Sequence, residues 1–352
     1  MSKIIVLGAG VVGLTTALEL KRDNPSHDIV VVGAHLPGDL NPDYTSPFAG
    51  ANWHSFAGPN DTRLQKLDKI GYRKFLDLAA NEPRSGVWTI KNSLLITEHF
   101  DKGSFSVPWF NGVVDDFTEL SKDQLTDGIV AGFSFKGVVI TTPIYLNYLL
   151  QRNLELGNQI RRIPKVATLA KVKQLHPNGE ADIVINCAGL LVKDLSDLND
   201  PNRNYTIRGQ VLHVRNCAKA EVEVEGFQGT KDEMLYLMPR KEGGCIIGGC
   251  FQQSLNKEED KALTQRIIER AIKYVPELID PAYQNNPKEI DIVRVNVGFR
   301  PFREGGARIE IDADRPWLIH NYGAGGGGYQ GSYGMAAEVV ELVHSLTLKG
   351  KL

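Results

Sequence analysis

Gly8-Ala9-Gly10-Val11-Val12-Gly13 follows an apolar run at residues 3–7, close to the beginning of the chain. Apolar positions with helical spacing come next, over residues 14–21, and a proline-containing break at residues 24–26 ends that pattern. A second apolar run then occupies residues 29–32. The segment therefore predicts a strand, a glycine turn, a helix and a second strand within about 30 residues.

Each glycine of this turn has a defined use in a site that binds a dinucleotide. Gly8 permits the tight turn, Gly10 lets the backbone approach a pyrophosphate, and Gly13 allows the helix to pack closely on the strand. The N–H groups at the beginning of the helix add partial positive charge for the phosphates. A glycine turn that binds nothing is the alternative, and the complete strand–turn–helix–strand context argues against it.

The dinucleotide fingerprint is incomplete at the end of the second strand. An acidic residue normally holds the ribose hydroxyls there, but Gly33, Ala34 and His35 follow Val32, and the nearest acid is Asp39. His35 could donate a hydrogen bond to the ribose in its place. The departure weakens the interpretation as an NAD- or NADP-dependent dehydrogenase, which stays open as an alternative.

A second glycine cluster, Tyr322-Gly323-Ala324-Gly325-Gly326-Gly327-Gly328-Tyr329-Gln330, directly precedes the last helical pattern, residues 335–346. Glycines at these positions would let a flat ring system lie against the backbone. The helix N-terminus behind them would stabilise the negative charge that a reduced flavin carries at its N1–C2=O edge. A flexible loop is the alternative, and the flanking strand and helix patterns argue against it.

The composition bounds the class of protein. The chain has 352 residues, which corresponds to roughly two domains. Its 40 basic and 42 acidic residues nearly balance, so a nucleic-acid partner is not expected. Glycine is the one unusual count, 35 residues against about 25 for a typical chain of this length.

No apolar run reaches about 18 residues, so no membrane-spanning helix is expected, and the N-terminus carries no signal-peptide pattern. The four cysteines are expected as free thiols. Cys245 and Cys250 lie in one predicted strand and are too far apart to reach each other. No Cys/His spacing suggests a zinc site, and no metal is expected.

The order of elements predicts a mixed α/β fold in which two domains are interleaved. A Rossmann-like nucleotide-binding domain is expected from residues 1–86, 143–200 and 312–352. An antiparallel-sheet domain is expected from residues 87–142 and 201–311. The second domain is thus inserted into the first in two parts.

Nearly the whole chain, from about residue 3 to 345, resembles the FAD-dependent D-amino-acid oxidases and the related D-aspartate oxidases. The resemblance is carried by residues 6–14 and by Thr45-Ser46-Pro47-Phe48-Ala49-Gly50-Ala51-Asn52-Trp53, a stretch most similar to the fungal members. Further matching segments are residues 183–189, 207–210, 236–239, 248–251, 296–301 and 322–330. The combination is specific, whereas the first glycine cluster by itself is not.

The resemblance implies FAD as cofactor, and a D-amino acid and O2 as substrates. Arg300 would bind the α-carboxylate, because its planar guanidinium matches a carboxylate bidentately, and Tyr236 would place its phenol on the same group. The implied substrate site consists of Tyr236, Phe251, Arg300, Gly326, Gln330 and Asn52. The implied FAD site consists of Gly8, Ala9, Gly10, Val11, Val12, Gly13, Ala34, His35, Thr45, Ser46, Gly50, Ala51, Asn52, Val166, Cys187, Ala188, Gly189, Arg300, Gly325, Gly326, Gly327, Gly328, Tyr329 and Gln330.

The reaction implied by the resemblance needs no general acid or base from the protein. Hydride would pass from the substrate Cα to flavin N5. The imino acid would hydrolyse to a 2-oxo acid and ammonia, and O2 would reoxidise the flavin to give hydrogen peroxide. No catalytic residue is therefore assigned, and His54, His213 and His320 are interpreted as structural.

Departures from the family pattern refine the expected substrate. The D-aspartate branch carries an arginine where this chain has Phe251, so neutral and aromatic D-amino acids are expected. D-Aspartate stays open as the alternative, with Arg240 as the nearby residue that could favour it. Asp232, in a presumed lid at residues 225–235, stands where relatives carry a tyrosine.

The ending Gly350-Lys351-Leu352 approximates a peroxisomal address, so import by the peroxisomal receptor is expected, and otherwise a cytoplasmic location. A homodimer is possible. The fungal type has a long insertion before the strand at Trp317 that is short here, so its mode of dimerisation is not assumed.

Overall fold

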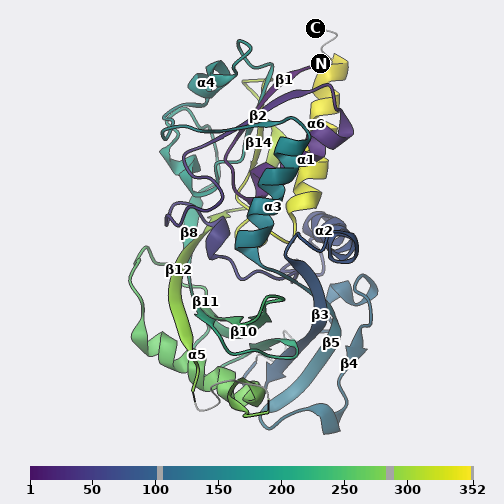
Figure 1. Ribbon diagram of the computed structural model, residues 1–352, viewed down its shortest axis with the longest axis vertical. Coiled ribbons are helices and arrows are strands. Elements are labelled where there is room, and N and C mark those ends of the chain that lie inside the picture. Colours follow the sequence, from purple (N-terminus) through teal and green to yellow (C-terminus); the bar gives the residue numbers. More distant parts are fainter. Residues whose placement is uncertain (101–105, 283–288, 350–352) are drawn as a thin grey trace.

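Two β-sheets and the helices around them form the protein, whose computed structural model describes residues 1–100, 106–282 and 289–349. Figure 1 shows one sheet with α1, α3 and α6 beside it, and the other sheet at the opposite end of the long axis. The helices are α1 (Val11–Asp23), α2 (Thr62–Asn81), α3 (Thr142–Glu155), α4 (Leu169–Val172), α5 (Lys261–Tyr274) and α6 (Ser332–Lys349). The predicted mixed α/β class is confirmed.

The first sheet has six strands in the order β13-β14-β7-β1-β2-β6. All neighbours are parallel except β13 and β14. Its strands are β1 (Lys3–Leu7), β2 (Asp28–Gly33), β6 (Gln159–Arg162), β7 (Ile183–Asn186), β13 (Arg308–Ile311) and β14 (Leu318–Tyr322). Ile4 and Val6 pack into the core under α1, α3 and α6, whereas Ile5 and Leu7 pack into the core on the other face. Burial on both faces explains why the strand is apolar throughout.

The second sheet has eight strands in the order β12-β8-β11-β10-β9-β3-β5-β4, antiparallel except for the β3–β9 pair. Its strands are β3 (Val87–Thr97), β4 (Thr118–Glu119), β5 (Ile129–Ile140), β8 (Asn204–Val214), β9 (Glu221–Glu225), β10 (Glu233–Pro239), β11 (Cys245–Cys250) and β12 (Ile292–Arg303). In β10, Leu235 and Leu237 join the core that α5 covers, and Tyr236 and Met238 lie on the opposite face. This alternation gives the sheet an inner face that can line a site.

One boundary drawn from the sequence is wrong. The residues of β13 (Arg308–Ile311) were expected in the antiparallel domain, but they pair with β14 at the edge of the first sheet. The physical reason is that β13 pairs antiparallel with β14, although the other neighbours in the first sheet are parallel. Its local sequence pattern therefore resembles that of the strands in the antiparallel domain. The remaining domain limits stay predictions.

Cys187, Cys245 and Cys250 are free thiols, as predicted. No helix in the described part of the chain is both long and apolar enough to cross a membrane. The segment Gly350-Lys351-Leu352, on which the expected peroxisomal address depends, lies outside the described residues.

Candidate functional site

One elongated cavity extends from the β1–α1 turn to the inner face of the eight-stranded sheet. The predicted FAD and substrate residues all line it except Gly327, whose carbonyl accepts the Gly331 N–H inside the last loop. The two glycine clusters, more than 300 residues apart in the sequence, therefore border the same space. Their roles in binding stay predictions, but the structure brings them together.

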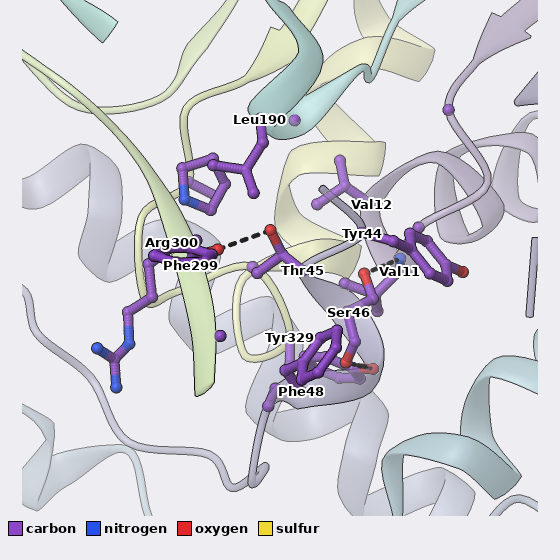
Figure 2. A pocket seen from close by; sticks show the side chains of 18 of the residues that line it. Val11, Val12, Tyr44, Thr45, Ser46, Phe48, Leu190, Phe299, Arg300 and Tyr329 are labelled. Atoms are coloured by element: carbon purple, nitrogen blue, oxygen red, sulfur yellow. Dashed lines mark hydrogen bonds between the residues drawn. The ribbon is translucent and has the colours of Figure 1, made fainter. Parts of the chain in front are cut away.

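The β1–α1 turn leaves no room for side chains. A Cβ on Gly13 would lie 1.9 Å from the Gly8 carbonyl oxygen, and a Cβ on Gly8 would lie 2.3 Å from the Cys187 carbonyl oxygen. Gly8 also has a φ of +111°, which favours glycine. At the start of α1, Val11 N–H donates to Ser46 Oγ at 3.0 Å (Figure 2). The other N–H groups of this first turn have no partner within the helix and can receive an anion.

One ring nitrogen of His35, just beyond the end of β2, has no hydrogen-bond partner among the described residues. Asp39 is held by Arg162 at 2.6 Å, and this ion pair lowers the pKa of Asp39. His35 Nε2 is buried and has no hydrogen-bond partner among the described residues. His35 is therefore the group available for a ribose hydroxyl, which fits the prediction made from the missing acid.

The last loop and the residues 44–48 form the middle of the cavity. Tyr329 donates its hydroxyl to the Ser46 carbonyl at 2.9 Å, and Thr45 Oγ1 donates to the Phe299 carbonyl at 2.8 Å (Figure 2). Gly323 and Gly325 have φ values of +82° and +57°. The loop is thus tied to the rest of the site and is not a free linker. Its bare backbone makes a cradle that fits a flat ring.

Arg300 brings an unpaired cation to the far end of the cavity. It projects from β12 on the side away from Val11 and Val12 (Figure 2). Its Nη1 donates to the Cys250 carbonyl at 2.9 Å, its Nη2 donates to the Tyr236 hydroxyl at 3.3 Å, and its guanidinium lies 4.1 Å from the Phe251 ring centre. No carboxylate of the described residues forms an ion pair with it. The site can therefore take a carboxylate from outside the chain.

Tyr236 is a neutral hydrogen-bond donor beside this cation. Burial raises its pKa above the usual value, and Arg300 opposes that shift. Its ring fits because Gly248 and Gly249 lack side chains. A Cβ on Gly248 would lie 2.3 Å from the Tyr236 ring, and a Cβ on Gly249 would lie 2.6 Å from the Tyr236 hydroxyl oxygen. The phenol and the guanidinium are thus presented together to the cavity.

His54, interpreted as structural from the sequence, lines the cavity and forms an ion pair. Its Nδ1 lies 3.0 Å from Glu223 Oε2, and Asn52 donates to Glu223 Oε1 at 3.0 Å. Burial disfavours the imidazolium, but Glu223 and the neighbouring glutamates outweigh this effect and raise the pKa of His54 to about 9. The same pair lowers the pKa of Glu223. One signal was available in the sequence, because Glu221, Glu223 and Glu225 alternate and so share one face of β9.

Loss of the His54–Glu223 pair should change stability in a pH-dependent way. The pKa of His54 rises from 6.5 when unfolded to about 9 when folded, so its contribution is complete below pH 6.5 and is lost as pH rises through 9. We expect the free energy of unfolding to differ most between the native protein and a His54→Asn variant near pH 6, and to converge by pH 10. Chemical denaturation across pH measures this. His213→Asn is the control, because the pKa of His213 is lowered. If the stability difference between the native protein and His213→Asn also disappeared by the same amount between pH 6 and pH 10, the assignment of the effect to the His54–Glu223 pair would be contradicted.

Two other sequence-based expectations concern Arg240 and the presumed lid. Arg240 does not line the cavity, and it donates to the backbone carbonyls of Ile140 and Gly50. It is therefore engaged and cannot serve a second substrate carboxylate. Residues 226–232 form only the short connection between β9 and β10, and Glu233 beyond it is held by two arginines of α5, at 2.6 and 2.7 Å.

The cavity also includes residues that the sequence did not single out: Tyr44, Phe48, Phe56, Glu223, Met234, Met238 and Phe299. Met238 could have been predicted, because it lies two positions after Tyr236 in one strand and such side chains point to the same face of the sheet. Among the described residues, no group of three or more His, Cys, Asp or Glu is arranged to hold a metal.

Comparisons with known proteins agree with this geometry. The family model described as "FAD dependent oxidoreductase" matches residues 3–342. A D-amino-acid oxidase of Fusarium vanettenii is 34% identical over 355 residues, which covers 97% of this chain and 96% of that protein. One from Schizosaccharomyces pombe is 34% identical, with 96% and 95% covered. A D-aspartate oxidase of Talaromyces thermophilus is 30% identical, with 97% and 95% covered.

Solved structures share the fold at low sequence identity. Glycine oxidase from Bacillus cereus superposes with a TM-score of 0.73 at 17% identity, covering 98% of this chain and 95% of that one. L-α-Glycerophosphate oxidase from Mycoplasma pneumoniae, solved with FAD bound, superposes with a TM-score of 0.67 at 15% identity and the same coverage.

Proposed function

The chain belongs to the FAD-dependent oxidoreductase family, and from that premise we propose that it is a D-amino-acid oxidase for neutral and aromatic substrates. The reaction converts a D-amino acid, O2 and water into a 2-oxo acid, ammonia and hydrogen peroxide. Membership of this family also removes the nicotinamide-dependent dehydrogenase that the first glycine cluster left open. The observation that carries the proposal is Arg300, an unpaired cation that lines the cavity beside the last glycine loop.

FAD, when bound, would accept a hydride from the substrate Cα and deliver two electrons to O2. The β1–α1 turn and the first turn of α1 would hold its pyrophosphate, and His35 would take a ribose hydroxyl. The loop at residues 323–330 would support the flat ring.

Arg300 and Tyr236 would fix the substrate by its α-carboxylate. The guanidinium has two N–H donors beyond those that bond the Arg208 carbonyl, the Cys250 carbonyl and the Tyr236 hydroxyl, and the phenol adds a further donor. Binding the carboxylate at a fixed point orients the Cα–H toward the ring, and orientation of this kind is a large catalytic term. No general acid or base is needed from the protein in this scheme.

The surroundings of the substrate side chain favour neutral groups. Phe251 stacks on Arg300 where an arginine would recognise a second carboxylate, and Arg240 is engaged elsewhere. These two features together support neutral and aromatic D-amino acids.

Oxidation of D-aspartate is the second candidate, and one observation favours it. His54 lines the same end of the cavity, and its raised pKa keeps it protonated at neutral pH. An imidazolium could attract a second carboxylate. It is already paired with Glu223 at 3.0 Å, so the pair as a whole carries no net charge, and the neutral substrates remain favoured.

A substrate panel separates the two candidates. We expect oxygen uptake and peroxide formation with D-alanine and D-phenylalanine without added NAD, and kcat/KM values for D-aspartate at least tenfold lower, because a buried unpaired carboxylate is costly. The matching L-amino acids serve as controls. Activity on D-aspartate alone would select the second candidate. If no D-amino acid were oxidised, both candidates would be excluded, and the remaining interpretation would be a nucleotide-binding protein without oxidase activity.

A further inference from the structure

Asp68 of α2 is a fully buried carboxyl group that the proposed chemistry does not use. Its exposed fraction is 0%. Ser55 donates its hydroxyl to Asp68 Oδ2 at 2.6 Å, and Trp109 Nε1 donates to the same hydroxyl at 3.0 Å. Asp68 Oδ1 has no hydrogen-bond partner among the described residues. A buried acceptor with half of its capacity free requires a nearby donor.

A free donor close to Asp68 belongs to Gln330, which lines the cavity and is 3% exposed. Its Nε2 likewise has no partner among the described residues. The Gln330 amide lies close enough to Asp68 to favour the ionised form of the carboxyl. The two unpartnered atoms, one acceptor and one donor, are therefore complementary neighbours.

Close backbone contacts fix Gln330 in front of α2. A Cβ on Gly71, one turn beyond Asp68, would lie 1.7 Å from the Gln330 carbonyl oxygen. A Cβ on Gly334 would lie 2.4 Å from Leu67 Cα, and a Cβ on Gly331 would lie 3.4 Å from Asp68 Oδ1. The helix and the loop are thus held in register, and Asp68 cannot move away from Gln330 without disturbing both.

The chemistry of the two groups determines which way the amide points. A carboxylate can only accept hydrogen bonds, so the NH2 end of Gln330 must face Asp68. The Gln330 oxygen is then directed to the cavity, where it can accept a hydrogen bond. We propose that Asp68 is a positioning residue that orients the Gln330 amide so that its oxygen receives the substrate amine. This inference rests on the proposed function, because it assumes an amino acid in the cavity.

Protonation of Asp68 should release this orientation. Burial is the largest effect on the pKa of Asp68 and raises it, and Asp61 raises it further. Ser55, Gln330 and His54 lower it, and the net pKa is about 6. Below that pH the carboxyl gains an O–H donor, and the amide is no longer forced to present its NH2 end. The preference for an amine-bearing ligand should therefore weaken on acidification.

Two unreactive ligands test the proposal on the FAD-bound protein without turnover. 2-Aminoisobutyrate has an amine and a carboxylate but no Cα–H, and pivalate carries a methyl group in place of the amine. We expect Asp68→Leu, which keeps the branched shape, to weaken 2-aminoisobutyrate binding about tenfold at pH 7.5 and to change pivalate binding less than twofold. Titrations of the flavin absorption spectrum give both affinities. Asp77→Leu, an exposed position on the same helix, is the matched control and should change neither.

A double variant distinguishes positioning from general damage. Gln330→Leu should show the same selective loss, and Asp68→Leu should add nothing to it, because Asp68 acts through Gln330. Additive losses, equal weakening of both ligands, or an unchanged affinity in Asp68→Leu would each overturn the proposal.

A pH titration gives an answer even if Asp68→Leu fails to fold. The native protein should lose affinity for 2-aminoisobutyrate between pH 7 and pH 5 with a midpoint near 6, and Gln330→Leu should not show this step. The same step in both proteins would overturn the proposal. Failure of the native protein to oxidise any D-amino acid is a separate result and would count against the proposed function.

Discussion

Replacing Arg300 with methionine should raise the KM for every D-amino acid by about 100-fold or more. The guanidinium is the cation available to the substrate carboxylate, because the described residues give it only neutral partners. Removing one member of a buried, hydrogen-bonded charge pair costs about 2–5 kcal/mol, and each 1.4 kcal/mol corresponds to about tenfold. Steady-state oxygen uptake over a range of D-alanine concentrations measures the change.

Arg294→Met is the matched control for this substitution. Arg294 lies on the same strand, β12, and does not line the cavity. We expect its KM to stay within about twofold of the native value. An Arg300→Met enzyme with unchanged KM would refute the assigned role of Arg300, provided that its flavin spectrum and unfolding temperature match those of the native protein.

Gly13→Ala should give a protein that is purified largely without flavin. Helix propensity alone would predict a more stable protein, because alanine stabilises a helix by about 1 kcal/mol relative to glycine. At this position the new Cβ would lie 1.9 Å from the Gly8 carbonyl oxygen. That oxygen belongs to the backbone, and the position of the Cβ is fixed by the backbone, so no side-chain rotation relieves the clash. The turn must therefore open, and overpacking of this kind costs about 1–3 kcal/mol or more. We expect FAD affinity to fall at least tenfold.

The ratio of flavin to protein absorbance, followed by titration with FAD, checks this expectation. Gly58→Ala is the control, because a Cβ there would meet no atom within 4 Å and Gly58 lies outside the cavity. A Gly13→Ala protein with native FAD affinity would show that the β1–α1 turn does not hold the pyrophosphate.

Much of the fold was predictable because its signals are local. β1, β2 and β7 are short continuous apolar runs, and both faces of their sheet are buried, so their composition alone marks them. α2 begins at Thr62 because Asp61 accepts the Leu64 N–H, a capping pattern visible in the sequence. The glycine turn identified the first strand and helix together.

The parts that could not be predicted depend on contacts between distant segments. The sequence of β13 is compatible with an antiparallel strand in either sheet. Only its pairing with β14 shows that it belongs to the first sheet. The protonated form of His54 is favoured by Glu223, which is 169 positions away along the chain. No local sequence pattern predicts that contact. Asp68 faces Gln330 only because Gly71 lets α2 approach the last loop and Gly334 lets α2 approach the beginning of α6.

Anaerobic mixing of the FAD-bound protein with single amino acids tests the central claim most directly. The account predicts that D-alanine and D-phenylalanine bleach the flavin absorption, that their L-enantiomers do not, and that admission of O2 restores the colour with release of hydrogen peroxide. Flavin that keeps its colour with both of these D-amino acids, or that is bleached by D-aspartate alone, would contradict it.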